Sequence, residues 1–238
     1  MSVNEVKLKG HLAVAEGTMA FRFSKPDGFV FKAGQAIRLE LIDPPAEAGQ
    51  GSRTLSLVSA PFEPELVVAT RMRDSAFKRA LKTLSDGASI RIDGPFGDLT
   101  LGDTERPAAF IAGGIGITPF MSMLRQAAED RSPQPLFLAY SNRRPEDSAF
   151  LDELQGLERQ NKYFHLMATM TDMSKSAREW SGETGFVDAD MLKRFVGDLA
   201  APMYYVVGPP AMVEAMQRTL GAAGIAEDKI RTEEFYGY

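Results

Sequence analysis

The chain has 238 residues, 44% hydrophobic and 25% charged, which is enough for one large domain or two ordinary ones with a real core. It has no cysteine, which excludes disulfides, thiolate nucleophiles, zinc–thiolate sites and Cys-ligated iron–sulfur clusters. The net charge of -5 argues against nucleic acid, and neither a signal peptide nor an apolar run of about 20 residues is present. We therefore expect a soluble, cytoplasmic protein without a membrane span, and no metal site.

The first hundred residues are strand-like. Short alternating segments, separated by Gly, Pro and Asp, predict a closed or nearly closed antiparallel barrel. One helix is expected over residues 75–84, because four of its apolar side chains share a face. The predicted strands cover residues 6–14, 18–24, 36–42, 53–59, 65–72 and 88–94.

After residue 107 strands and helices alternate, which predicts a parallel sheet with helices on both faces. Buried strands are expected over residues 108–114, 135–141, 163–170, 203–208 and 230–235. Helices are expected over residues 118–130, 146–160, 188–196 and 210–224. The predicted domains are residues 1–103 and 104–238.

The segment AGGIGITPF, residues 112–120, follows a buried strand and opens a helix. Gly113, Gly114 and Gly116 allow positive φ and close approach of the backbone to a ligand. Thr118 is expected to cap the helix, whose N-terminus offers N–H groups to a pyrophosphate. The pattern lacks the third glycine of the ordinary dinucleotide fingerprint, and a purely structural turn is the alternative.

Two further turns are expected at the same edge of the sheet. One strand ends in Asn142 and Arg143, where NAD sites tend to carry an acid and where an arginine can accommodate the 2′-phosphate of NADP. A later strand leads through Gly208 and Pro209 into the helix that contains Met212. Ligands bind at the carboxyl edge of an open α/β sheet, so these turns predict a nicotinamide site there, with NADPH and NADH both open.

Five motifs follow one another along the chain: RTLS at 53–56, GPFG at 94–97, GGIGITP at 113–119, VGPPAMV at 207–213 and an aromatic C-terminus. Together they resemble the ferredoxin–NADP reductase superfamily over essentially the whole chain. The resemblance implies an N-terminal antiparallel flavin-binding β-barrel and a parallel-sheet α/β nucleotide-binding domain. It also implies FAD, with FMN less expected, and NADPH or NADH as co-substrate.

The resemblance assigns roles residue by residue. Arg53 would pair with the flavin phosphates, and the Ser56 hydroxyl would point toward the reactive edge of the flavin ring. The set implied for the flavin is Arg53, Thr54, Leu55, Ser56, Ser75, Ala76 and Phe77. The set implied for NAD(P)H is Gly114, Gly116, Thr118, Gly208, Pro209 and Met212. Asn142 and Arg143 at the strand end, and Arg71, are the remaining cofactor-binding candidates.

The sequence ends in EEFYGY, and in this family an aromatic residue near the C-terminus covers the flavin face that the nicotinamide must reach. Phe235 is the first choice for that ring, with Tyr238 and Tyr236 behind it. Packing of the tail on the barrel is the alternative. Ser56, Thr118 and Phe235 are thus the residues expected at the reacting centre.

Two positions depart from the family pattern. Leu55 stands where most members have an aromatic residue, and it cannot donate a hydrogen bond to the flavin. Val207 stands where many members have a cysteine that is associated with hydride transfer. The second departure bears on the nicotinamide geometry and the rate of transfer.

The expected function is a flavin-dependent NAD(P)H oxidoreductase that splits a hydride pair for a separate one-electron carrier such as ferredoxin or flavodoxin. A reductase of a small acceptor (free flavin, ferric chelate or quinone) and a flavin- or nucleotide-binding sensor or regulatory subunit are the alternatives. The basic stretch Arg71, Arg73, Lys78, Arg79 and Lys82 is a candidate docking face for an acidic carrier.

Overall fold

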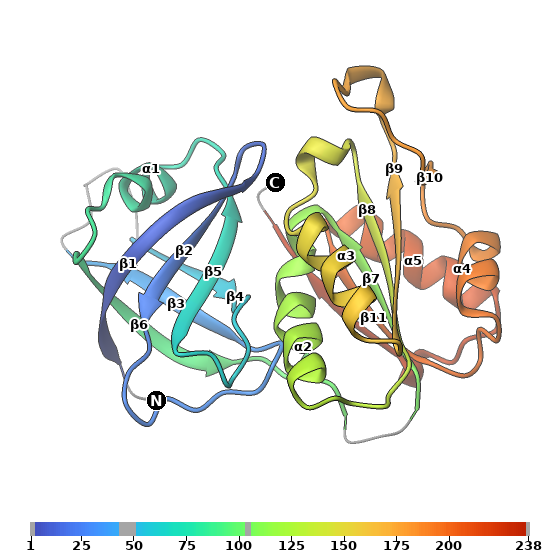
Figure 1. Cartoon of the computed structure of the whole chain (residues 1–238), viewed down its shortest axis with the longest axis horizontal. Helices are drawn as coiled ribbons and strands as arrows, with labels where there is room; N and C mark the ends of the chain where they lie inside the picture. Colours follow the sequence, from blue (N-terminus) through green and yellow to red (C-terminus); the bar gives the residue numbers. More distant parts are fainter. Residues whose placement is uncertain (1–2, 43–50, 103–105, 237–238) are drawn as a thin grey trace.

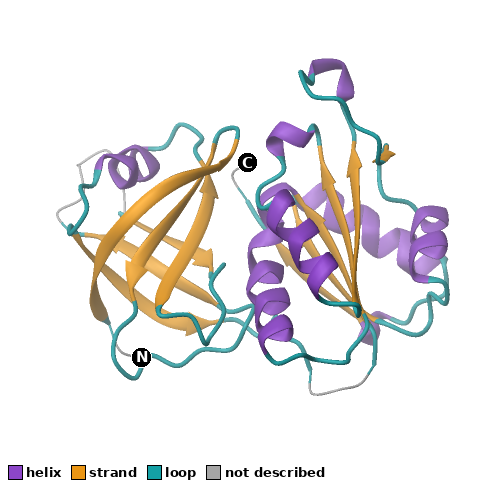
Figure 2. Ribbon diagram, in the orientation of Figure 1, coloured by secondary structure: helices purple, strands orange, loops and turns teal. Residues whose placement is uncertain are grey.

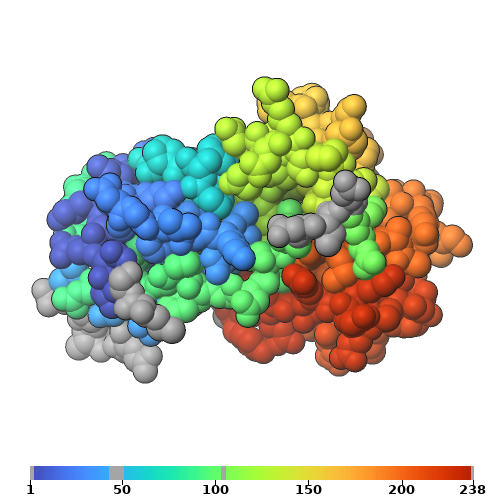
Figure 3. Space-filling view, turned by 90° about the horizontal axis from the view of Figure 1, so that it is seen from below, coloured from blue at the N-terminus to red at the C-terminus, as the bar shows by residue number. Residues whose placement is uncertain are grey.

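The structure, a computed structural model, describes residues 3–42, 51–102 and 106–236. Two halves lie side by side along the long axis of the molecule and abut directly in the space-filling view (Figures 1 and 3). Within the described residues, each half contains one six-stranded sheet. The first sheet is antiparallel and the second is parallel, which confirms the predicted fold class.

The first half is the predicted barrel. Its strands are β1 (Asn4–Ala15), β2 (Thr18–Ser24), β3 (Ala36–Leu41), β4 (Ser52–Ser56), β5 (Glu65–Arg71) and β6 (Ser89–Phe96). They pair in the order β4-β3-β6-β1-β2-β5, and a bridge from Leu57 to Val68 brings the two outer strands together. Alternate residues such as Phe21, Phe23 and Leu39 point inward and are fully buried.

Helix α1 (Ala76–Thr83) lies where the sequence predicts it. Its N-cap is Ser75, whose hydroxyl accepts a hydrogen bond from the backbone N–H of Lys78 at 3.2 Å. Phe77 and Leu81 are buried and belong to the barrel core. The apolar face of α1 therefore packs on the barrel core and fixes the position of the helix.

The second half is a parallel sheet between two layers of helices (Figure 2). Its strands are β7 (Ala108–Gly113), β8 (Leu136–Asn142), β9 (Phe164–Met170), β10 (Glu183–Thr184), β11 (Met203–Gly208) and β12 (Ile230–Glu234), in the order β10-β9-β8-β7-β11-β12. The helices are α2 (Thr118–Glu129), α3 (Leu151–Gln160), α4 (Ala189–Val196) and α5 (Pro210–Ala222). Short 3-10 turns cover Gly114–Ile117, Pro145–Asp147, Met173–Lys175 and Glu227–Lys229.

The central strand β7 is buried on both faces. Phe110 packs in the cluster that contains residues of α2 and α3, whereas Ile111 packs with residues of α4 and α5. A continuous apolar strand is the expected sequence for such a position, because no face of it meets water.

Helix α2 also joins the two halves. Phe120 and Met123 share one buried cluster with Val58 and Ala69 of the barrel half. This common core makes the two sheets parts of one packed body, in which residues of both can contribute to one site.

Two sequence-based expectations about this half need correction. The helix predicted over residues 146–160 begins only at Leu151, because Asp147 is held by Arg144 and Phe150 adopts a left-handed φ of 61°. The short edge strand β10 was not predicted at all. Its two residues are too few to show a periodic pattern.

The connection between the sheets runs from Phe96 to Ala108. The predicted boundary between residues 103 and 104 falls in this connection, and residues 103–105 lie outside the described part of the chain. Among the helices that the structure describes, none is long and apolar enough to cross a bilayer.

Candidate functional site

Two cavities adjoin where the halves meet. The first, the barrel cavity, has a volume of about 660 Å³ and lies among β4, β5, the start of α1 and the end of β12. The second, the sheet-edge cavity, has about 410 Å³ and lies at the carboxyl ends of β7, β8 and β11. Arg73 and Ile115 line both cavities, so a ligand in one lies next to a ligand in the other.

Most of the predicted site residues line one of these cavities. The barrel cavity takes Arg53, Thr54, Leu55, Ser56, Ser75, Phe77, Thr118 and Phe235. The sheet-edge cavity takes Arg71, Gly114, Asn142, Arg143, Pro209 and Met212. Ala76, Gly116 and Gly208 line neither cavity, and Tyr238 lies outside the described residues.

One wall of the barrel cavity carries three cations and one carboxylate, that of Asp74. Arg53, Arg73 and Lys78 all line it, and the Arg53 guanidinium lies 5.4 Å from the centre of the Phe77 ring. Burial, together with the charges of Arg53 and Arg73, lowers the pKa of Lys78. Three cations that face one space repel one another, so the wall is suited to an anionic ligand.

Ser56 and Thr118 approach the barrel cavity from opposite halves. Both are almost completely buried, with 4% and 1% of their surface exposed. The expected N-cap role of Thr118 is wrong: it is the first residue of α2, and its hydroxyl donates to the carbonyl of Ile115 at 3.0 Å. The 3-10 turn before α2 already starts the helical path, so both the backbone N–H and the hydroxyl of Thr118 donate back to the carbonyl of Ile115.

The C-terminal tail, residues 233–236, forms part of the wall of the barrel cavity. The backbone N–H of Phe235 donates to the carbonyl of Gly208 at 2.9 Å, which continues the pairing of β12 with β11, and the half-buried ring lines the cavity. Glu233 also lines it, and burial raises the pKa of this carboxyl. Tyr236 is 76% exposed, and its hydroxyl bonds to Glu234.

The glycine turn after β7 serves close packing as well as a ligand. Of Gly113, Gly114 and Gly116, only Gly114 has a positive φ (56°), contrary to the expectation for all three. A Cβ at Gly116 would overlap the carbonyl oxygen of Val207 and stand 2.7 Å from its carbon. Gly116 is therefore needed so that the turn can rest on β11.

Asn142 lines the sheet-edge cavity with a side chain that is only 5% exposed. Its amide group lies beside the buried hydroxyl of Tyr140, and neither amide atom makes a hydrogen bond of good geometry within the described residues. Buried polar groups are nearly always satisfied, so a small rotation of this side chain would let the amide bond a ligand in the cavity. The exposed Arg143 follows at the rim, whereas Arg144 turns away and pairs with Asp147.

Comparison with known proteins gives the family. An oxidoreductase NAD-binding domain model matches residues 110–218. Ferredoxin–NADP reductase B of Sorangium cellulosum is 30% identical over 224 residues, which are 90% of this chain and 89% of that protein. The chain belongs to the ferredoxin–NADP reductase superfamily. As a member, it is a flavoprotein oxidoreductase, and FAD and NAD(P)H are the cofactors of the class.

Solved structures agree with this membership. A ferredoxin–NADP⁺ reductase from Neisseria gonorrhoeae with bound FAD and NADP superposes with a TM-score of 0.82 at 25% identity, over 98% of this chain and 99% of that one. Other relatives are longer. The chain is 29% identical to the reductase component of glycine betaine monooxygenase in Chromohalobacter salexigens and spans 60% of it, and it spans 42% of the anthranilate 1,2-dioxygenase electron transfer component of Acinetobacter baylyi.

The family motifs did not mark every residue of the site. Arg73 and Lys78 belong to the basic stretch that we expected to dock a carrier, but the start of α1 directs them into the barrel cavity. Arg79 and Lys82 remain on the outside, and Arg79 pairs with Asp74. The five-residue spacing of Arg73 and Lys78, on either side of the N-cap, could have indicated that both face the cavity. Counting the charges of the basic stretch did not separate them from Arg79 and Lys82.

Proposed function

We propose that this protein transfers electrons from NAD(P)H, held in the sheet-edge cavity, through FAD, held in the barrel cavity, to a separate one-electron carrier such as ferredoxin or flavodoxin. The contact of the two cavities at Arg73 and Ile115 is the observation that carries this proposal. When bound, FAD accepts two electrons together and can release them singly. The protein supplies binding, orientation and exclusion of water.

The barrel cavity has the groups that FAD requires. Arg53, Arg73 and Lys78 would neutralise the two phosphates, and the N-terminus of α1 would add its backbone N–H groups. Leu55 offers an apolar side chain to the ring system, and Ser56 a hydroxyl near its edge. In the proposed state Phe235 covers the ring until the nicotinamide enters.

The sheet-edge cavity has the groups that a nicotinamide dinucleotide requires. The turn at Gly114 would expose backbone to the pyrophosphate, and the Asn142 amide in the cavity wall would bond a ribose or the carboxamide. Arg71, Arg73 and Arg143 line this cavity, and its described lining residues include no carboxylate. This charge distribution favours the additional 2′-phosphate of NADPH over NADH.

An anaerobic titration with each coenzyme tests the proposal directly. The purified protein should show flavin absorption, which bleaches on addition of NADPH and less readily with NADH. A colourless protein that cannot be reconstituted with FAD would refute the proposal. A coloured protein that no nicotinamide bleaches would instead support a sensor or regulatory subunit.

The acceptor requires a separate test. Several relatives are reductase components of oxygenases, among them the propane 2-monooxygenase reductase component of Rhodococcus jostii, which supports a protein carrier. Turnover with ferredoxin or flavodoxin should exceed turnover with free flavin, ferric chelates or quinones. Replacing Arg79 and Lys82 with Gln, while leaving Lys78 in place, should slow carrier reduction at low salt and spare ferricyanide reduction. Equal rates for the variant and the wild type would exclude this docking face.

A further inference from the structure

Each cavity takes walls from both halves of the molecule. Thr118 and Phe235 complete the barrel cavity, whereas Arg71 and Arg73 of the barrel half complete the sheet-edge cavity. The relative position of the halves therefore decides where a hydride donor in one cavity lies against an acceptor in the other. Small displacements between reacting groups have large effects on rate.

The first place where polar contacts join the halves is the buried side of α2. The Ser122 hydroxyl donates to the carbonyl of Ser59 at 2.7 Å. Arg125 donates to the carbonyl of Val58 and pairs with Glu63, both at 3.3 Å. These bonds lie beside the apolar cluster that both halves share. Together the bonds and the cluster form the α2 contact, which holds the two halves together.

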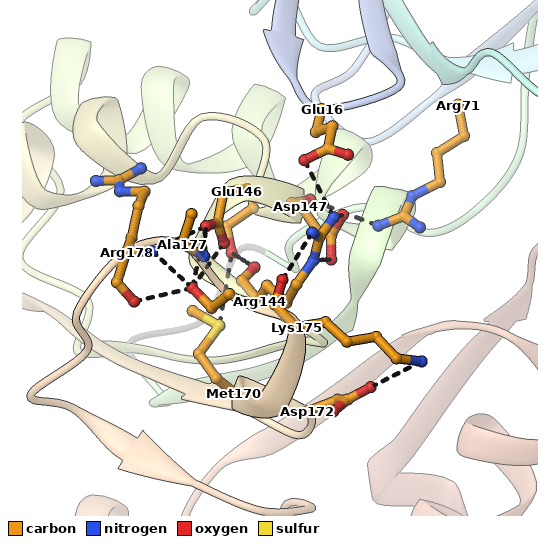
Figure 4. A network of polar contacts seen from close by, with 12 residues as sticks. Glu16, Arg71, Arg144, Glu146, Asp147, Met170, Asp172, Lys175, Ala177 and Arg178 are labelled. Carbon is orange, nitrogen blue, oxygen red and sulfur yellow. Dashed lines mark hydrogen bonds and ion pairs between the residues drawn. The ribbon is translucent and has the colours of Figure 1, made fainter.

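The second place lies at the tip of the β1–β2 hairpin, next to the loop that follows β8 (Figures 1 and 4). The backbone N–H of Glu16 donates to the carbonyl of Glu146 at 2.8 Å. The Glu16 carboxylate pairs with Nη2 of Arg144 at 3.1 Å. One hairpin residue thus makes both a backbone and a charged contact with the other half.

Arg144 is itself held in a fixed orientation. Its Nε and Nη2 donate to the two carboxylate oxygens of Asp147 at 3.0 and 2.9 Å, and its Nη1 donates to the carbonyl of Lys175 at 3.2 Å. The carbonyl of Asp147 accepts from Arg71 at 3.5 Å, and Arg71 lines the sheet-edge cavity. Figure 4 follows this path from the barrel hairpin through Arg144 and back to a barrel strand.

We propose that Glu16, Arg144 and Asp147 form a positioning cluster that sets the angle between the two halves beside the sheet-edge cavity, and so aligns NAD(P)H with the flavin. The inference rests on the proposed function. The α2 contact joins the halves, and a bond from Arg231 to the carbonyl of Thr100 at 3.1 Å links them at the connection. The positioning cluster restricts rotation on the opposite side, beside the sheet-edge cavity. The Glu16 side chain is 63% exposed, so its ion pair contributes little to stability. We expect this ion pair to affect the alignment of NAD(P)H with the flavin instead.

Glu16→Gln and Glu16→Lys test the cluster without leaving the buried Asp147 unpaired. The first variant removes the charge but keeps the backbone bond to Glu146, and the second repels Arg144. Rapid-mixing reduction of bound FAD by NAD(P)H should show a limiting rate lowered about three- to tenfold in Glu16→Gln and further in Glu16→Lys. The melting temperature should stay within about 3 °C of the wild type.

Glu65→Gln is the matched control. Glu65 pairs with Arg22 at 3.4 Å, and both residues lie within the barrel, so this variant loses an exposed ion pair that does not cross between the halves. Its limiting rate of flavin reduction should equal that of the wild type. A control that slows as much as Glu16→Gln would overturn the proposal, because the loss would then follow any exposed charge.

A second readout does not depend on cofactor activity. Since the chain has no cysteine, Val30→Cys in the barrel and Gln217→Cys in α5 would carry a unique pair of spin labels at exposed positions. The distance distribution between them should shift or broaden in Glu16→Lys and not in Glu65→Gln. An unchanged distribution together with a wild-type reduction rate would refute the positioning cluster. If no nicotinamide reduces the wild type, the proposed function fails, and the label distances still decide whether the cluster orients the halves.

Discussion

Gly116 offers a sharp test of how the nucleotide turn is built. In Gly116→Ala the new Cβ would overlap the carbonyl oxygen of Val207 and come to 2.7 Å from its carbon and 3.0 Å from the backbone nitrogen of Gly208. Real Cβ atoms essentially never approach below 3.0 Å, and the obstacle is backbone of the central sheet rather than a flexible side chain. The turn before α2 must therefore move away from β11.

Such overpacking costs about 1–3 kcal/mol. For a protein of this size that corresponds to a fall in melting temperature of roughly 3–10 °C. Because the displaced turn leads directly into Thr118 at the barrel cavity, the affinity for NADPH and the rate of flavin reduction should fall as well. Denaturant unfolding and rapid-mixing kinetics measure the two effects separately.

Gly156→Ala is the matched control for the same chemical change. Gly156 lies inside α3, and its added Cβ would meet only the Arg159 guanidinium at 3.8 Å. Relief of the glycine penalty in a helix should stabilise this variant by about 0.5–1 kcal/mol. The steric reasoning is refuted if Gly116→Ala unfolds at the wild-type denaturant concentration and binds NADPH normally.

Four further outcomes are expected. Lys78→Gln should weaken FAD binding roughly ten- to hundredfold, as measured by equilibrium dialysis. It should also stabilise the apoprotein at neutral pH, because the lowered pKa of Lys78 shows that folding disfavours its charge. An apoprotein less stable than the wild type would contradict this reasoning about charge. Burial raises the pKa of Glu233, so the folded protein keeps this proton to higher pH and loses stability as the pH rises above 4.5. In urea unfolding, the gain in stability of Glu233→Gln over the wild type should therefore grow as the pH rises above 4.5. A difference in stability that stays constant with pH would exclude this effect. Asn142→Ala should weaken NADPH binding roughly two- to tenfold by titration and leave apoprotein stability nearly unchanged; normal binding would show that the amide faces no ligand. Deleting residues 235–238 should change both the flavin spectrum and the affinity for NADPH if Phe235 is a lid. A change in melting temperature alone would show that the tail only packs on the barrel.

Local pattern was sufficient for the architecture. Alternating side chains specify the strands of the barrel, continuous apolar runs such as β7 specify buried parallel strands, and the glycine turn marks the edge where a nucleotide binds. These features depend on neighbours within a few residues, because side-chain periodicity and turn geometry are local properties. The family motifs at Arg53 and Ser56 likewise identify residues that line the barrel cavity.

Contacts between distant segments were decided only by the tertiary structure. Whether Lys78 or Lys82 faces the cavity depends on how α1 packs on the barrel, and the role of Gly116 depends on a carbonyl some ninety positions later along the chain. Arg143 and Arg144 are adjacent and chemically identical, yet one lines the cavity and the other binds a hairpin of the opposite half. The sequence alone determined the main elements and their order, except strand β10 and the start of α3, and it indicated the class of chemistry. The burial and charge around each side chain were determined by the packing of the two halves, because they depend on neighbours far away in the chain.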